Sequence, residues 1–237
     1  MNKVLRCIIL GVAVTTAMNV QATEIDMDNP ASVAHWAQMN DLIRETRQKA
    51  LTDDVALKKL IRMNYDVNFG SYSSGSLISD MRERASRKDA GEDGISLERE
   101  IKVMESMVRE GLTALEKNEK EYQSYDDVVS CTLMLGALPD YDILPLLKEC
   151  LKSKSEGLRR NVLIRYILVK EAESIPFLRE AIKDANLTES SRSSIYGRLN
   201  STTINLKDRN KNDDVEKIKA FVQEMRQAEN PKEKGEN

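Results

Sequence analysis

The strongest constraint on the fold is a phrase that occurs twice in the chain. Residues 144–152 (LPLLKECLK) and residues 175–183 (IPFLREAIK) follow the same pattern at a separation of 31 residues. In both copies proline stands second, and a glutamate and a lysine occupy the same later positions. A repeat of about 30 residues usually marks one supersecondary unit that stacks on copies of itself. The sequence therefore predicts a repeat architecture.

The residues around the first phrase have the apolar spacing of a helical hairpin. Apolar residues in the segment 128–138 recur at steps of three and four, which places them on one helical face. Ser124–Asp127 is interpreted as a capping box before this helix, and Pro139 as part of its end. The apolar residues of 144–151 then predict a second helix. The expected unit is helix, tight turn, helix.

Two further copies follow the first, and the second of them matches less well. The third copy fits only if a long loop separates its two helices, over residues 201–212. Terminal repeats often diverge because they cap the stack, so we expect this copy to be the last one. The predicted helices are 158–169 and 175–185 in the second copy, and 192–199 and 215–225 in the third.

The segment LGALPDYDILPLLKECLKSKSEGLRRNVLIRYIL resembles HEAT and HEAT-like repeats. In that pattern the first helix ends in Leu-Gly-x-Leu-x-Asp, a proline opens the second helix, and an arginine lies just inside the next first helix. The resemblance covers residues 124–200 and implies an all-α fold, a short αα-solenoid whose second helices line the concave side. Asp126 and Asp127 depart from the pattern, which puts the upstream edge of the stack near Ser124. The resemblance implies almost nothing about activity.

The part of the chain before the repeats is expected to be an N-terminal helical segment. Its Gly/Ser-rich stretch 68–76 is interpreted as a connector, or alternatively as a binding loop that presents Phe69 and Tyr72. Asp89–Gly94 is interpreted as a turn. The predicted helices open at Pro30 and reach Ala50, follow Thr52 through Ile61, and run from Ser96 to about Tyr122.

The first residues have the pattern of a secretory signal peptide. Lys3 and Arg6 precede an apolar run over 7–17, and Val20–Ala22 has the small residues of a cleavage site. The run is short for a bilayer span, so a retained membrane anchor is the weaker interpretation. We therefore expect a periplasmic or secreted protein without a membrane span after cleavage.

The composition supports a helical, mildly acidic protein. Of 237 residues, 41% are hydrophobic, 32% charged and only 5% aromatic, with a formal net charge of −3. Nucleic acid is not an expected partner, because its phosphates call for a basic domain. The predicted organisation is a signal peptide (1–22), the N-terminal helical segment (23–121), HEAT-like repeats (122–228) and a disordered tail (229–237).

Catalytic chemistry has little support in the sequence. The single histidine, His35, has no nucleophile pattern around it and is expected to be structural. Asp208–Glu216 resembles the start of a calcium loop but lacks the turn glycine and the closing carboxylate, so no metal site is predicted. We predict no cofactor and no enzyme activity. The function expected instead is non-catalytic binding or scaffolding of a protein partner.

A second function class stays open because aspartates and glutamates are numerous. A periplasmic hydrolase or carbohydrate-active accessory protein would use a pair of carboxyl groups about 5 to 9 Å apart in a cleft. Such a cleft would favour this alternative, whereas a shallow groove would favour binding.

The two cysteines beyond the predicted signal peptide are expected to face each other. Cys131 and Cys150 lie at equal distances from the turn of the first hairpin, and the next copy has Val162 and Ala181 at the aligned positions. In an oxidising compartment a disulfide between them would contribute about 3 kcal/mol. The alternative is a pair of small core side chains with free thiols. The sequence leaves both open.

Aligned basic residues on the second helices predict a partner-binding strip. Such columns become ladders across an αα-solenoid, and they suit an acidic protein segment or an anionic polymer. The alternative is a solvated face, because Glu149 and Glu180 lie beside these bases. The strip consists of Lys148 and Arg179 in one column and Lys152 and Lys183 in another, with Lys219 as a less certain member of the first.

Overall fold

The computed structural model describes residues 30–69, 74–86, 94–118 and 122–229. All regular secondary structure in these ranges is helical, which confirms the predicted all-α fold. The chain divides into two compact units, residues 1–100 and 101–237. Each unit is described by itself.

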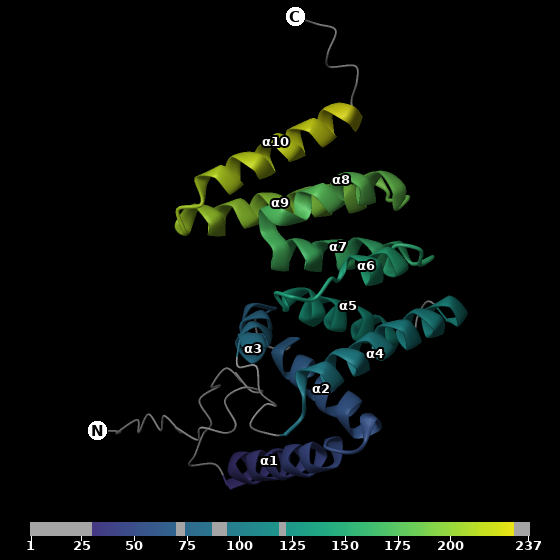
Figure 1. The fold of residues 1–237 in the computed structure, drawn as a ribbon, viewed down its shortest axis with the longest axis vertical. Coiled ribbons are helices and arrows are strands. Elements are labelled where there is room, and N and C mark those ends of the chain that lie inside the picture. The colour runs from purple at the N-terminus through teal and green to yellow at the C-terminus, as the bar shows by residue number, and fades with distance from the viewer. Residues whose placement is uncertain (1–29, 70–73, 87–93, 119–121, 230–237) are drawn as a thin grey trace, which may run out of the picture. The chain divides into compact units, whose positions relative to one another are not determined.

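The first unit holds α1 (Pro30–Ala50), α2 (Asp54–Phe69), α3 (Ser74–Ser86) and the first turn of α4 (Leu97–Lys117), labelled in Figure 1. Helix α1 packs against α2, and α2 packs against α3. Their shared core is apolar and almost fully buried. Its members include Ile43, Ala50, Leu57, Leu60, Ile61, Ile78 and Met81.

Arg99 fixes the turn between α1 and α2. Its guanidinium donates to the carbonyl oxygens of Ala50 and Leu51 at 2.7 and 2.6 Å, and it pairs with Asp54 at 2.7 Å. Ala50 is the last residue of α1 and Asp54 the first of α2. One side chain therefore satisfies carbonyls that the end of α1 leaves without helical partners.

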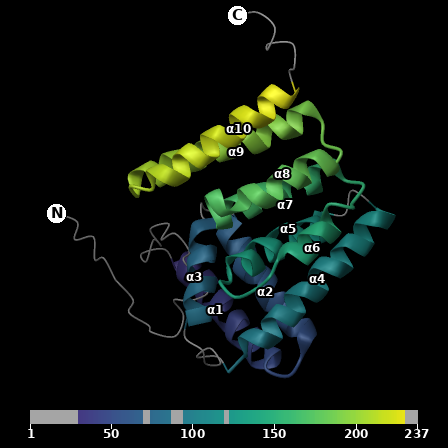
Figure 2. The same ribbon diagram turned by 45° about the horizontal axis from the view of Figure 1, so that its top comes forward.

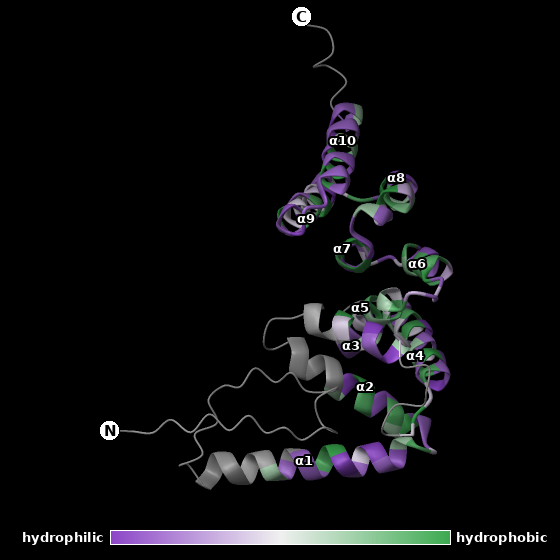
Figure 3. Ribbon diagram, turned by 60° about the vertical axis from the view of Figure 1, so that its left-hand side comes forward, coloured by the Kyte–Doolittle hydropathy of each residue, from purple (hydrophilic) through white to green (hydrophobic). Residues whose placement is uncertain are grey.

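The second unit is a series of helical hairpins preceded by the main part of α4. Helices α5 (Tyr122–Ala137), α7 (Glu156–Lys170) and α9 (Glu189–Asp208) pack in order, α5 on α7 and α7 on α9. Figure 3 shows α4, α6 and α8 on the other side of this row. Figure 2 shows α10 running alongside α9, against which it packs. The remaining elements are α6 (Leu144–Cys150), a 3₁₀ turn η1 (Glu171–Ser174), α8 (Ile175–Asp184) and α10 (Asn212–Glu229).

Local signals explain where these helices begin. Ser155 caps α7 by accepting from the backbone N–H of Leu158 at 3.3 Å, and Thr188 caps α9 by accepting from Ser191 at 3.3 Å. The proline of each repeated phrase lies in the first turn of α6 or α8, where the missing N–H costs nothing. The predicted helices of the first two copies are confirmed.

The repeated arginine inside α7 has a structural role. Arg159 is only 9% exposed and donates to the carbonyl oxygens of Ser153 (2.5 Å), Lys154 (2.9 Å) and Asn186 (3.2 Å). The first two lie in the connection before α7, and the third in the connection before α9. Arg159 therefore fastens two consecutive inter-hairpin connections to one helix.

Arg192 is the counterpart of Arg159 in α9, and it also bonds the connection before its own helix. It donates to the carbonyl oxygen of Leu187 at 2.5 Å and pairs with Glu229, at the end of α10, at 2.6 Å. The arginine that the resemblance singled out thus holds the loop before its own helix in both hairpins.

Two predicted helix boundaries are wrong. Ser124–Asp127 is not a capping box, because α5 begins at Tyr122 and Ser124 is a buried residue within it. The predicted loop 201–212 is also wrong, because α9 continues to Asp208. In that extension Thr202 and Thr203 are buried, and their hydroxyls donate to the carbonyls of Arg198 and Asn200. Side-chain burial outweighs the low helix propensity of the two threonines.

Three smaller corrections concern the other helix ends. Helix α4 ends at Lys117, before the predicted end near Tyr122. Helix α10 begins at Asn212 and ends at Glu229, so it extends beyond the predicted range 215–225 at both ends. The Gly/Ser-rich stretch is helical at both ends, since α2 reaches Phe69 and α3 begins at Ser74.

The closest backbone approach among the described glycines is at Gly111, where α4 meets α5. A Cβ at this position would lie 2.8 Å from the carbonyl oxygen of Ser124 and 2.8 Å from Val128 Cγ2. Gly111 and Ser124 are both buried. The glycine therefore lets α4 lie directly on the first turns of α5.

Candidate functional site

The predicted strip lies on α6 and α8 of the second unit. Lys148 is on α6, Lys152 follows it, and Arg179 and Lys183 are on α8, all exposed. In Figure 3 these two helices lie on the same side of the unit. The structure thus places the four residues on neighbouring second helices.

Arg179 is already engaged within the protein. It forms an ion pair with Glu224 of α10 at 2.8 Å, and its guanidinium lies 5.7 Å from the centre of the Phe221 ring. Lys219, also on α10, pairs with Glu216 at 2.7 Å. Both charges are partly offset before any partner arrives.

The three lysines of the strip differ from Arg179. Lys148, Lys152 and Lys183 form no ion pair with any side chain in the described ranges, and all three are exposed. Glu149, which follows Lys148, is 3.5 Å from Arg109 of α4. The neighbouring glutamate therefore has a basic partner other than the strip lysines.

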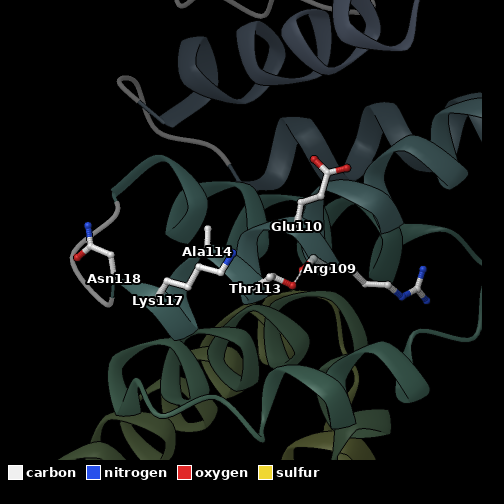
Figure 4. Close-up of a pocket in the computed structure, with 6 residues that line it drawn as sticks. All are labelled: Arg109, Glu110, Thr113, Ala114, Lys117 and Asn118. Carbon is white, nitrogen blue, oxygen red and sulfur yellow. Dashed lines mark hydrogen bonds between the residues drawn. The ribbon is translucent and has the colours of Figure 1, made fainter.

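Helix α4 adds basic residues that the sequence analysis did not assign. A shallow hollow of about 480 Å³ runs along its C-terminal half, shown in Figure 4. Arg109 and Lys117 lie eight residues apart on the lining face, which is the spacing of one helical stripe. The lining residues are Arg109, Glu110, Thr113, Ala114, Lys117 and Asn118.

A polar chain joins this part of α4 to the first hairpin. The Tyr141 hydroxyl donates to Glu105 Oε1 at 2.7 Å, Glu105 pairs with Arg109 at 3.1 Å, and Arg109 reaches Glu149. The Tyr141 hydrogen bond holds the pKa of Glu105 below its usual range, and burial with the same bond raises the pKa of Tyr141. These polar contacts thus favour a charged Glu105 and a neutral Tyr141.

The perturbed carboxyl groups do not have the character of general acids. The pKa of Glu105 is lowered, and hydrogen bonds from Ser191 and Thr188 lower that of Glu156 to about 2. A general acid in a two-carboxylate mechanism needs the opposite shift. Both glutamates instead hold residues of connections, Tyr141 before α6 and Thr188 before α9.

Cys131 and Cys150 are both buried and both free thiols in the structure. Burial raises the pKa of Cys150 to about 12, and Cys131 Sγ lies 4.0 Å from Met107 Sδ on α4. A thiol with so high a pKa is a poor nucleophile at neutral pH. A disulfide between the two cysteines stays a prediction.

Several predicted features fall outside the described residues. These are the signal peptide (1–22), Tyr72 of the alternative binding loop, the larger part of Asp89–Gly94, and the tail after Glu229. His35 belongs to α1 and Phe69 is the last residue of α2, but the side chains of both are outside the part of the chain that the structure describes.

No family model, curated protein or solved structure matches this chain. Within the ranges that the structure describes, no helix has both the length and the apolar character to cross a membrane. The same residues hold no group of three or more histidine, cysteine or acidic side chains arranged to bind a metal ion.

Proposed function

We propose that the protein is an exported, non-catalytic binding module whose second helices bind an acidic protein segment. The hairpins form a short HEAT-like αα-solenoid in this proposal, with α4, α6 and α8 along the partner-binding side. The protein works in the periplasm or outside the cell after removal of residues 1–22.

The repetition of structural detail supports the solenoid. Successive first helices begin with a hydroxyl cap and carry an arginine that bonds the preceding connection, at Ser155 and Arg159 and again at Thr188 and Arg192. Each first helix packs on the next. Stacked units of this kind offer an extended surface to a partner.

The observation that carries the binding proposal is the set of three exposed lysines without ion pairs, Lys148, Lys152 and Lys183. In a protein of net negative charge, such a set gives one face a local positive potential. Lys117 extends that face onto α4 beside the hollow, whereas the charge of Arg109 is partly offset by Glu105 and Glu149. Charge complementarity then favours an acidic segment and makes its association sensitive to salt.

A charge-reversal experiment tests this proposal. In K148E/K152E/K183E we expect affinity for poly-L-glutamate, a model acidic segment, to fall at least about tenfold at low salt. The matched control K49E/K59E/K207E makes the same charge change at three exposed lysines that are not members of the strip. Equal weakening in both variants, with unchanged helical circular dichroism, would show that only the overall charge matters.

Export has its own test, independent of binding. Expressed with its full sequence in a Gram-negative host, the protein should accumulate in the periplasm with Thr23 as its first residue, as measured by intact mass. A periplasmic pool that retains residues 1–22, or no periplasmic pool at all, would contradict export by a cleaved signal peptide.

A further inference from the structure

The first helices carry a second pair of arginines at repeated positions. Ser155 and Thr188 cap α7 and α9, and 33 residues separate the two caps. The same separation relates Arg159 to Arg192, and it also relates Arg165 to Arg198. Because α7 packs directly on α9, Arg165 and Arg198 occupy equivalent positions on adjacent helices.

Arg198 is used very differently from Arg159 and Arg192. Arg159 and Arg192 both donate to backbone carbonyls of the preceding connections. The Arg198 guanidinium donates no hydrogen bond and forms no ion pair with any residue in the described part of the chain, and its Nε is buried without a partner. Arg159 Nε also lacks a partner, but its terminal nitrogens donate to backbone carbonyls, and Arg192 forms its ion pair with Glu229 through Nε at 2.6 Å.

The surroundings of Arg198 add another positive charge. Arg165 is half-buried, and its pKa is lowered by burial and then by the charge of Arg198. Asp126 and Tyr125 of α5 act on Arg165 in the opposite direction, but neither affects the pKa of Arg198, which burial alone lowers. The groups that offset positive charge at this place therefore lie on α5 and act on Arg165.

A half-buried guanidinium without an acceptor is unfavourable, and a like charge beside it adds to the cost. A purely structural arginine would have an acceptor, as Arg159 does. The arrangement becomes favourable when an anion supplies the missing acceptors. A guanidinium presents a planar fork of donors that matches the oxygens of an oxyanion.

We propose that Arg198, assisted by Arg165, binds a phosphate group on the row of first helices. A phosphate group has several oxygens, so it can accept from the Arg198 fork and from a donor on the adjacent helix at once. The site is separate from the lysine strip, since it lies on α7 and α9, whereas the strip lies on α6 and α8.

Inorganic phosphate is the probe for this site, measured by calorimetry and by thermal unfolding at constant ionic strength. We expect wild-type protein to bind phosphate and to be stabilised by it beyond chloride. In R198M binding is lost, and in R198K affinity falls at least about tenfold because the fork is gone. R44M removes an exposed arginine of α1 that is ion-paired with Asp41 and belongs to neither proposed binding site, and it should bind as wild type does.

The general salting effect of phosphate stabilises any folded protein, so the decisive quantity is the difference between wild type and R198M. Without phosphate, R198M should be at least as stable as wild type, because it removes an unsatisfied buried donor. A wild-type response no larger than that of R198M overturns the proposal. If R198M does not fold, an unchanged phosphate affinity in R198K overturns it.

The source of the phosphate is distinguished by a second titration. A phosphoserine peptide and free inorganic phosphate share the same headgroup chemistry. Tighter binding of the peptide, lost in R198M, identifies a phosphorylated ligand. Equal affinities identify free phosphate.

Discussion

Hairpins α7–α8 and α9–α10 begin in the same way and end differently. Each first helix starts after a hydroxyl cap and carries its arginine at the same place, yet α7 has 15 residues and α9 has 20. Helix α7 stops before Glu171, whose φ is +50°, and a 3₁₀ turn leads into α8. Helix α9 runs on to Asp208 and reverses at Asn210, whose φ is +58°.

The difference shows that the starts and the ends of these helices are specified by different things. A start is encoded locally, by the cap and by the arginine that holds the connection in front of it. The end of a helix depends on which residues further along the sequence have to be buried. In α9 the extra turns bury Thr202, Thr203 and Leu206, and the connection between α9 and α10 has no proline that would fix an earlier start of α10.

The largest effect is expected when the arginine that both first helices share near their start is removed. Arg159→Ala should lower the free energy of unfolding by about 3 kcal/mol, because it leaves three carbonyl oxygens without a charged donor. Arg192→Ala should cost only about 1.5 kcal/mol, since it loses one carbonyl contact and one partly exposed ion pair. Urea unfolding measures both. Equal losses would show that the contact with the following connection has no weight.

A pair of glycine substitutions compares a crowded helix with an open one. Gly111→Ala should destabilise by about 2 kcal/mol, because the new Cβ meets the Ser124 carbonyl oxygen of α5. Gly197→Ala on α9 should stabilise by about 0.5–1 kcal/mol, since nothing lies within 4 Å of its Cβ and alanine favours helix. Opposite shifts in thermal midpoint are the expected result. A stabilising Gly111→Ala would contradict the close approach of α4 to α5.

The first hairpin can be given the side chains of the second at the level of its cysteines. Cys131→Val with Cys150→Ala copies Val162 and Ala181, which are buried at the aligned positions. We expect a loss below about 1.5 kcal/mol under oxidising conditions. A loss near 3 kcal/mol, removed by prior reduction of the wild type, would instead indicate a disulfide. Peptide mapping after alkylation identifies the state of each cysteine.

The smallest expected effect concerns the contact between α7 and the cap of α9. The pKa of Glu156 lies at about 2, below its usual 4.5, so its charged form stabilises the fold above pH 4.5 and this contribution is lost as pH falls towards 2. In Glu156→Gln that titration is absent. The difference in stability between wild type and variant should therefore shrink from pH 5 to pH 2. A difference that stays constant over this range would show that the carboxylate charge has no part in the contact.

The fold could be predicted where periodicity and caps agree. The repeated phrase predicts α6 and α8 because its proline and apolar spacing are local signals, and α7 follows from the apolar spacing of the second copy. Helix α3 was not assigned, since its sequence opens within a Gly/Ser-rich stretch, SGS, that is typical of a connector. The extension of α9 was missed because burial of its threonines is a tertiary effect.

The candidate site could be predicted only in part. The alignment of the two second helices places Lys148 on α6 and Lys183 on α8, as the structure does. The alignment could not show that Glu224 of α10 would form an ion pair with Arg179. The α4 residues Arg109 and Lys117 were missed because α4 lacks the repeat phrase. Their eight-residue spacing was a usable signal. The equivalent positions of Arg165 and Arg198 could also be predicted from the 33-residue offset, but the partial burial of both side chains could not.

The contact between Glu156 and Thr188 has a consequence for how the second unit unfolds. Glu156 Oε1 accepts from both the backbone N–H and the hydroxyl of Thr188, at 2.8 and 2.6 Å. The cap that nucleates α9 is therefore held by the first turn of α7. Fraying of α7 at this end releases the start of α9, so the two helices should open together. Hydrogen exchange should then detect one cooperative unit spanning both hairpins instead of two independent ones.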